Sequence, residues 1–340
     1  MKTLRPAAVL SALALLTAAG LGTAGCSRSA PAPSAEDLPG AARPADGEFS
    51  VMTFNLDRYA LSAPEGLDDA APAAPPPGAD AIVRAIRQAS PDVLAVQGMG
   101  PPDAWDDFRF RLRQAGLEYR FEEYLSRDDD QELRLAVLSR HPIVSRSPRI
   151  RDRYTIGPGQ FPVLRGFIEL DIEPDPGYRF RLFVAHLKSK RFHEYGQAEM
   201  RRNEARLLAN HIRASLQENP GLNLLVAADF SDEPGSRALR EVLFYQGKPV
   251  LFDLRPADPD GDAWTRRTDA DRHLRTSFLL VNNGMLNEVL PDKTRILQTP
   301  GLRNATAHRP LIATFAAREQ GPESAPDLSE RRPVEYPEYD

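Results

Sequence analysis

Polar residues of the types used in catalysis follow several apolar segments of this sequence. Asn55 and Asp57 come directly after FSVMTF, and His186 ends the segment FRLFVAH. Asp229 follows NLLVAA, and His308 stands shortly before the last apolar segment. Carboxylate and amide oxygens can hold a hard divalent cation, while an imidazole can move a proton or stabilise a phosphate oxygen. If the apolar segments are strands, these side chains can converge at one sheet edge.

The apolar pattern predicts the elements that would position these side chains. Short apolar segments bounded by turn residues indicate strands at 49–54, 93–96, 119–124, 133–138, 167–172, 178–186, 223–227, 278–281 and 311–315. Helical periodicity indicates helices at 79–89, 105–114 and 197–216. The turn residues at 174–177 predict a hairpin between two of the strands. This order is typical of a layered α/β domain with mixed strand directions.

Six segments, taken in chain order, carry a family resemblance. They are TFNLD, PDVLAVQ, LAVLSRHPIV, HLKSK, ADFSDEPGS and AHRPL, which span roughly residues 48–316. In this order they resemble motifs of the endonuclease/exonuclease/phosphatase superfamily. The resemblance implies a four-layer α/β/β/α sandwich, in which two mixed sheets pack face to face with helices outside. It also implies phosphoester hydrolysis that depends on magnesium or manganese.

The same resemblance implies roles for the polar residues at the strand ends. Asn55 matches the family's metal-site asparagine, and Asp57 matches an aspartate that some members place two residues later. Asp229 matches the central catalytic aspartate. His186 matches a histidine that contacts phosphate, and His308 matches the terminal catalytic histidine.

Four family positions hold residues that lack the expected group. Gly98 stands where a glutamate usually follows Gln97, and Ser231 stands in place of an asparagine. Ser277 and Ala307 replace two aspartates that support the terminal histidine. Loss of an aspartate beside a catalytic histidine costs about 10⁴ in rate, and loss of one electrostatic donor costs roughly 10² to 10³. These replacements predict a nearly inactive site.

Two functions remain open at this point. In the first, the chain is a degenerate pseudoenzyme that keeps the sandwich and a cleft for a phosphate or other ligand, and needs no cofactor. In the second, it is a nuclease-like phosphodiesterase or phosphatase whose remodelled site holds magnesium or manganese through Asn55, Asp57 and Asp229. Either reading allows a phosphorylated small molecule or a nucleic acid as ligand. A carboxylate filling the space near Gly98 would favour the enzyme.

The N-terminal residues predict export. Lys2 and Arg5 precede an apolar run at 9–21, which is short for a membrane span, and small residues lead into Cys26, the only cysteine. This pattern resembles a bacterial lipoprotein signal that is cleaved before Cys26, which is then lipidated. The expected location is the cell envelope, outside the cytoplasm and anchored to a membrane. Ser27 favours the outer membrane if the cell has one.

The rest of the chain divides by composition. Residues 1–25 would be the signal peptide, 26–47 a tether rich in proline, alanine and serine, and 48–316 the folded domain. Residues 317–340 are acidic and proline-rich, and predict a disordered tail. With one cysteine no internal disulfide can form, and the net charge of −5 disfavours a surface that coats nucleic acid.

Two further expectations concern the surface of the domain. The segments 57–78, 147–163 and 187–198 are expected to be the variable loops that select a ligand. On the long helix, four charged residues are expected to form a solvated face, namely Arg201, Arg202, Glu204 and Arg206.

Overall fold

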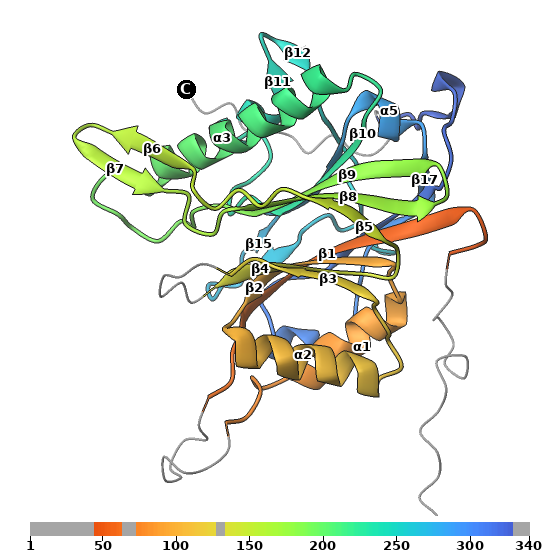
Figure 1. Cartoon of the computed structure of the whole chain (residues 1–340). Coiled ribbons are helices and arrows are strands. Elements are labelled where there is room, and N and C mark those ends of the chain that lie inside the picture. The colour runs from red at the N-terminus through yellow and green to blue at the C-terminus, as the bar shows by residue number, and fades with distance from the viewer. Residues whose placement is uncertain (1–43, 63–72, 127–132, 329–340) are drawn as a thin grey trace, which may run out of the picture. The chain divides into compact units, whose positions relative to one another are not determined.

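The computed structural model describes residues 44–62, 73–126 and 133–328. They form two six-stranded mixed sheets that pack face to face (Figure 1). Helices α1 and α2 lie on the outer side of one sheet, and α3 lies on the outer side of the other (Figure 1). The predicted α/β/β/α sandwich is therefore confirmed.

The first sheet has the strand order β17-β18-β1-β2-β4-β3. Its strands are β1 (Glu48–Tyr59), β2 (Val93–Met99), β3 (Phe121–Tyr124), β4 (Arg134–Ser139), β17 (Val289–Ile296) and β18 (Leu311–Ala316). Only β1 and β2 pair in parallel; the other neighbours are antiparallel. Its outer face is covered by α1 (Ala79–Ala89) and α2 (Pro102–Gln114).

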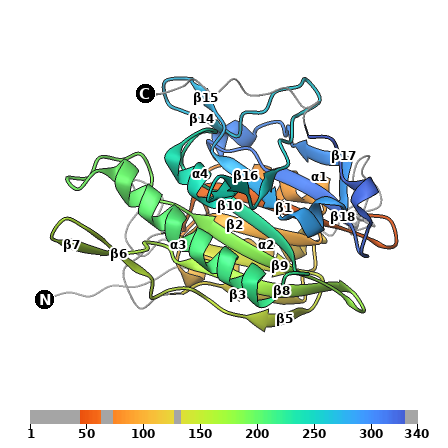
Figure 2. The same cartoon turned by 90° about the horizontal axis from the view of Figure 1, so that it is seen from above.

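The second sheet has the order β13-β16-β10-β9-β8-β5. Its strands are β5 (Ile143–Arg146), β8 (Phe167–Asp175), β9 (Tyr178–His186), β10 (Asn223–Asp229), β13 (Phe252–Asp253) and β16 (Ser277–Val281). Here only β9 and β10 are parallel. Figure 2 shows α3 (Gln197–Glu218) and α4 (Arg237–Leu243) running over this sheet. The hairpin predicted at 174–177 is confirmed by the antiparallel pair of β8 and β9.

Short elements make up the remainder. Three two-stranded ribbons are β6 (Arg153–Ile156) with β7 (Gly159–Pro162), β11 (Phe244–Tyr245) with β12 (Lys248–Pro249), and β14 (Arg266–Arg267) with β15 (His273–Leu274). The helix α5 (Asn283–Leu286) and two 3₁₀ turns (Leu302–Asn304 and Pro322–Ser324) complete the fold. The ribbon of β6 and β7 occupies most of the segment expected to be a loop at 147–163.

Alternation along the strands separates the core into layers and aims the site residues. Val51 lies in the cluster between the sheets, whereas Met52 lies in the cluster under α1 and α2. Since successive side chains point to opposite faces, Asn55 continues the inward series of Val51. By the same register His186 and Asp229 continue inward series on β9 and β10, where they are paired. The strand ends therefore deliver their polar residues into the space between the sheets.

The predicted chain ends are partly outside the described residues. The signal peptide 1–25, Cys26 and the tether as far as residue 43 lie outside them, as do residues 329–340. The prediction of a disordered tail is wrong for 317–328, because Ala317 is buried and Leu328 packs against the core between the sheets. Glu319 also accepts a hydrogen bond from Asn223 (2.9 Å). No helix in the described ranges is both long and apolar enough to cross a membrane.

Candidate functional site at the strand ends

Asp229 is the centre of the site and is only 1 % exposed. Its Oδ2 accepts a hydrogen bond from Asn55 Nδ2 (2.9 Å), and its Oδ1 accepts one from the Ser231 backbone N–H (2.7 Å). The hydroxyls of Ser277 and Thr276 donate to Oδ2 over 3.3 and 3.4 Å. Both carboxylate oxygens are therefore engaged by groups of the protein itself.

The two histidines lie against this carboxylate. His308 Nδ1 lies 3.2 Å from Asp229 Oδ2, and His186 is the register partner of Asp229 on the neighbouring parallel strand. The His308 and His186 residues are 5 % and 8 % exposed. The structure thus brings together four of the predicted residues. Asp57, the fifth, contributes its backbone N–H to Asn55 Oδ1 (2.9 Å), while its side chain is exposed.

Burial sets the charge of these groups. It lowers the pKa of His186 well below the ordinary histidine value, and the nearby charge of Arg165 lowers it further against the opposing effect of Asp229. Burial also lowers the pKa of His308, opposed by Asp229 and Asp57. Burial alone would raise the pKa of Asp229, but the histidines and the hydrogen bonds from Asn55 and Ser231 lower it. Because both imidazoles are neutral at pH 7, the hydrogen bonds are what stabilise the carboxylate there.

Atoms of β1 fill the space that a side chain at position 98 would occupy. The φ of Gly98 is +75°, and a Cβ there would lie 2.7 Å from the carbonyl oxygen of Asp57 and 2.8 Å from Asn55 Oδ1. The cause is a bulge: between the pairs Asn55–Gln97 and Tyr59–Met99, three residues of β1 lie opposite Gly98 alone. Asp57, in that bulge, also has a positive φ of 63°. Glycine is thus required at position 98 by the present backbone.

Gln97 has a structural role in this arrangement. Its Nε2 donates to Thr53 Oγ1 (3.0 Å) on the adjacent strand and lies 3.4 Å from the carbonyl oxygen of Ala227 in the opposite sheet. Gln97 is fully buried. It therefore ties the two sheets together directly beneath the site.

The donor set does not fit magnesium or manganese. Hard cations need several oxygen donors, preferably anionic. Asn55 turns its amide nitrogen to Asp229, since a carboxylate can only accept, and its oxygen to the Asp57 N–H, which can only donate. Across residues 44–62, 73–126 and 133–328, no group of three or more histidines, cysteines, aspartates or glutamates is arranged to hold a metal.

Two arginines that no sequence motif indicated face the site. Arg165 Nη1 donates to the carbonyl oxygens of His186 (3.2 Å) and Leu187 (3.1 Å), and its Nε is buried without a hydrogen-bond partner in the described part of the chain. Arg266 of β14 forms a backbone bridge with His308. Both cations lower the pKa of His186. They come from an irregular segment and a two-residue strand, where periodicity gives no signal.

The long helix contributes a buried anchor to the same region. Glu204, expected on a solvated face, is buried and accepts hydrogen bonds from the backbone N–H groups of Lys188 (2.6 Å) and Leu164 (3.4 Å). Burial raises its pKa to about 7. Arg201 is also buried and pairs with Asp232 (2.9 Å). The prediction of solvation is therefore wrong for these two residues, which hold the loop after β9 instead.

Two mixed sheets packed face to face, with histidines and an aspartate at inward strand ends, define the class of phosphoesterase-like α/β/β/α sandwiches. Within that class the chain belongs to the endonuclease/exonuclease/phosphatase family, whose model matches residues 52–284. No curated protein sequence matches the chain significantly.

Solved structures share the fold at low sequence identity. The human Nocturnin catalytic domain is 18 % identical with a TM-score of 0.56, covering 80 % of this chain and 95 % of that one. Sphingomyelinase C from Streptomyces griseocarneus is 16 % identical with a TM-score of 0.53, covering 79 % and 99 %. ANGEL2, a 2′,3′-cyclic phosphatase, is 14 % identical with a TM-score of 0.53, covering 79 % and 95 %. These likenesses concern the fold.

Proposed function

We propose that this chain is a degenerate member of its family, which binds a phosphate-bearing ligand at the strand ends without metal-dependent hydrolysis. The observation that carries the proposal is the filled space at Gly98. The family resemblance implies a metal-binding glutamate there, yet a Cβ would meet Asn55 and Asp57 at under 3 Å. Among the described residues, the three atoms nearest to such a Cβ are the amide oxygen of Asn55 and two backbone atoms of Asp57, and none of them belongs to a carboxylate.

The other replaced positions support the same reading. Ser277 places a hydroxyl 3.3 Å from Asp229, where the resemblance implies a second carboxylate. Ala307 has no polar side chain, and its carbonyl oxygen accepts from the Arg267 N–H (2.8 Å). Such a site lacks the additional carboxylates that the resemblance implies around the metal and the terminal histidine.

Binding of phosphate is favoured by the charges that remain. Arg165 and Arg266 lie near two neutral imidazoles, and the Asp229 carboxylate beside them already accepts hydrogen bonds at both oxygens. His186 Nδ1 is buried without a hydrogen-bond partner among the described residues. A phosphate oxygen placed there would meet donors and two positive charges, the arrangement that binds anions in water-poor sites.

The proposal includes export and lipid anchoring through Cys26, at the cell envelope. It is supported by the basic start, the short apolar run and the small residues before the cysteine. Expression of the full chain in a bacterial host tests it by membrane fractionation and mass spectrometry. We expect a membrane-bound, acylated product that begins at Cys26, and a Cys26→Ser variant that is not acylated. An unmodified cysteine in the mature wild type would contradict it.

The hydrolysis test uses bis(p-nitrophenyl) phosphate and plasmid DNA with millimolar magnesium or manganese. We expect no metal-dependent turnover above a protein-free blank. A phosphate titration followed by calorimetry should show binding that a His186→Ala variant loses. Metal-dependent turnover that disappears in Asp229→Ala would overturn the degenerate reading.

A second candidate keeps one specific observation in its favour. The 3.2 Å approach of His308 Nδ1 to Asp229 gives the histidine a carboxylate despite Ser277 and Ala307. This candidate is a phosphodiesterase or phosphatase with a remodelled metal site using Asn55, Asp57 and Asp229. It requires the oxygens of Asn55 and Asp229 to leave their present hydrogen bonds, and the same hydrolysis assay decides between the two.

A further inference from the structure

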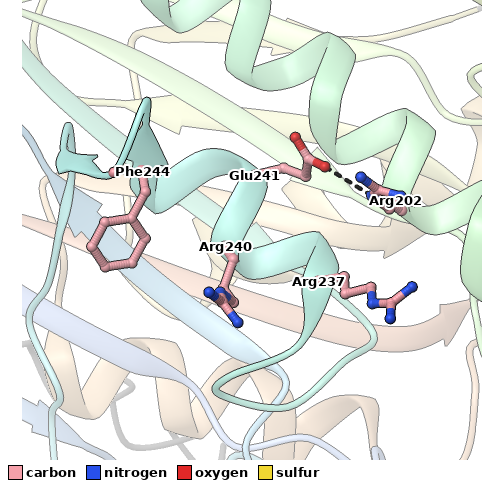
Figure 3. Close-up of a pocket in the computed structure, with 6 residues that line it drawn as sticks. Arg202, Arg237, Arg240, Glu241 and Phe244 are labelled. Atoms are coloured by element: carbon pink, nitrogen blue, oxygen red, sulfur yellow. Dashed lines mark hydrogen bonds and ion pairs between the residues drawn. The ribbon is translucent and has the colours of Figure 1, made fainter. Parts of the chain in front are cut away.

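A second basic site lies on the helical layer outside the second sheet, between α3 and α4 (Figure 3). The cavity has a volume of about 550 Å³. Its walls are formed by Arg202, Arg237, Arg240, Glu241, Phe244 and Gly247. Pockets that hold small molecules in proteins have volumes of about 300–1,000 Å³. Asp229, in contrast, points into the space between the sheets, so the two sites are on opposite faces of this sheet.

The periodicity of α4 aims its side chains into the pocket. Arg237 and Arg240 are three residues apart, which places them on neighbouring positions of the helix surface, and Phe244 follows in the extended strand β11 directly after the helix. Figure 3 shows Arg240 extending below α4, Arg237 extending outward from its first turn, and Glu241 pointing toward Arg202 of α3. The opposite face of α4 is anchored, because Ala238, Leu239 and Val242 are buried against the second sheet. The lining of the pocket is therefore held on a fixed element.

The charges in the pocket are unbalanced. Arg202 is compensated by Glu241, 2.8 Å from its Nε, and by Glu199 at 3.8 Å. The side chains of Arg237 and Arg240 make no hydrogen bond or ion pair with any residue from 44–62, 73–126 or 133–328. Two uncompensated guanidinium groups beside one cavity favour an anion, and phosphate matches their planar, forked donors.

An aromatic wall completes the pocket. Phe244 and Tyr245 are 44 % and 46 % exposed, which is unusual for large apolar side chains in this molecule. The ribbon that carries them turns through Gln246 (φ 49°) and Gly247 (φ 75°), a two-residue turn with positive φ at both positions that fixes its geometry. Arg213 of α3 lies 4.7 Å from the Tyr245 ring centroid. The ring of Phe244 thus offers apolar surface next to the free arginines.

We propose that this pocket is a second ligand site, which takes a phosphate-bearing molecule with an apolar or aromatic portion. Arg237 and Arg240 hold the phosphate, and the portion next to it packs on Phe244. The ligand is either a free phosphate ester or the headgroup of an anionic lipid, since both present the same chemistry to the arginines.

The test uses the full-length chain and two probes. Calorimetric titration compares phenyl phosphate with inorganic phosphate, and vesicle co-sedimentation compares phosphatidylglycerol with phosphatidylcholine. The double variant Arg237→Ala/Arg240→Ala should lower affinity at least tenfold, because charge-assisted bonds are lost. The control Arg84→Ala/Arg113→Ala removes the same charge from exposed positions of α1 and α2 and should change affinity less than about twofold. Phe244→Ala should abolish any preference for phenyl phosphate over inorganic phosphate.

Each outcome decides the matter. Loss of phenyl phosphate binding in the first double variant supports a free ester, and loss of phosphatidylglycerol binding alone supports a lipid headgroup. The proposal is overturned if the wild type binds neither phenyl phosphate nor phosphatidylglycerol vesicles. It is also overturned if both double variants bind equally well. Binding that is lost only in His186→Ala assigns the phosphate to the strand-end site, which contradicts this inference while supporting the proposed function.

Discussion

The imidazole Nδ1 of His308 lies 3.2 Å from Asp229 Oδ2, the same oxygen that accepts a hydrogen bond from Asn55. One carboxylate therefore serves the residue that the family resemblance assigns to metal binding and the residue that it assigns to proton transfer. In the arrangement implied by the resemblance these tasks belong to separate carboxylates, at positions now held by Gly98, Ser277 and Ala307. Asn55, Ser231 and Ser277 donate hydrogen bonds to this carboxylate, which leaves few free oxygens at the site.

Substitution of Gly98 should cost more than backbone strain alone. We expect Gly98→Ala to lower the free energy of unfolding by about 1–3 kcal/mol for the positive φ, and by a further 1–3 kcal/mol for the contacts with Asp57 and Asn55. Gly116→Ala is the matched control, because its φ is +78° and nothing lies within 4 Å of the added Cβ. Urea unfolding of both variants measures the difference. Equal losses would show that the space at Gly98 is open.

A carboxylate restored at position 277 should repel Asp229. The Ser277 hydroxyl donates to Asp229 Oδ2 over 3.3 Å, so Ser277→Asp would bring two buried anions together. We expect a loss of about 1–3 kcal/mol at pH 7 relative to Ser277→Asn, which has a similar size but no charge. The difference in unfolding free energy between the two variants should become smaller toward pH 4, because one of the two neighbouring carboxylates then takes up a proton. A difference that is independent of pH would rule out charge repulsion as the cause.

Acid should destabilise the protein through its buried histidines. Burial lowers the pKa of His186, so below about pH 6.5 the unfolded chain binds a proton that the folded chain does not. Stability from this source is present above pH 6.5 and falls as the pH drops, by at most about 1.4 kcal/mol per pH unit. His186→Gln should show a smaller loss between pH 7.5 and 5.0. The stability of His186→Gln at pH 7.5 is the internal control for packing. The prediction would be contradicted if its stability fell with decreasing pH as steeply as that of the wild type.

Glu288 should make the protein less stable at alkaline pH, whereas the buried histidines make it less stable in acid. Burial and the nearby Glu319 together raise the pKa of Glu288 to about 8, although Tyr178 donates a hydrogen bond to it. The folded state thus binds an extra proton between the ordinary glutamate pKa and about 8, and this source of stability is lost as the pH rises through that window. We expect Glu288→Gln to raise the melting temperature at pH 8.5 and to have little effect at pH 4.5. The exposed Glu118→Gln is the control, and equal effects of the two substitutions would refute the prediction.

The apolar pattern was enough to predict a layered α/β domain, and the family resemblance added the four-layer sandwich and the four site residues that converge. Asn55 lies on the inward face of β1, and His186 and Asp229 end β9 and β10 on their inward faces, so strand periodicity together with family motifs placed them correctly. The lack of space for a side chain at Gly98 could not be predicted in this way. It depends on a bulge in β1, a separate strand, and on where the Asn55 amide and the Asp57 backbone come to lie.

Residues on irregular or very short elements were also beyond sequence reasoning. Arg165 lies between strands, and Arg266 lies on a strand of only two residues. Glu204 has the composition of a solvated helix position, and only its contact with the loop after β9 explains its burial. Arg237 and Arg240 occupy a seven-residue helix whose partner, α3, begins forty residues earlier in the chain.

The bulge opposite Gly98 limits which residues position 98 can hold. Glycine and glutamate codons can differ by a single base, so the exchange is one step at the level of the gene. A glutamate there, however, would meet Asn55 and the Asp57 backbone before it could reach a cation. The exchange would need coordinated changes in β1, including loss of the left-handed conformation at Asp57. The backbone around position 98 therefore makes the exchange of glycine for glutamate a change of several residues, although the codon needs only one base.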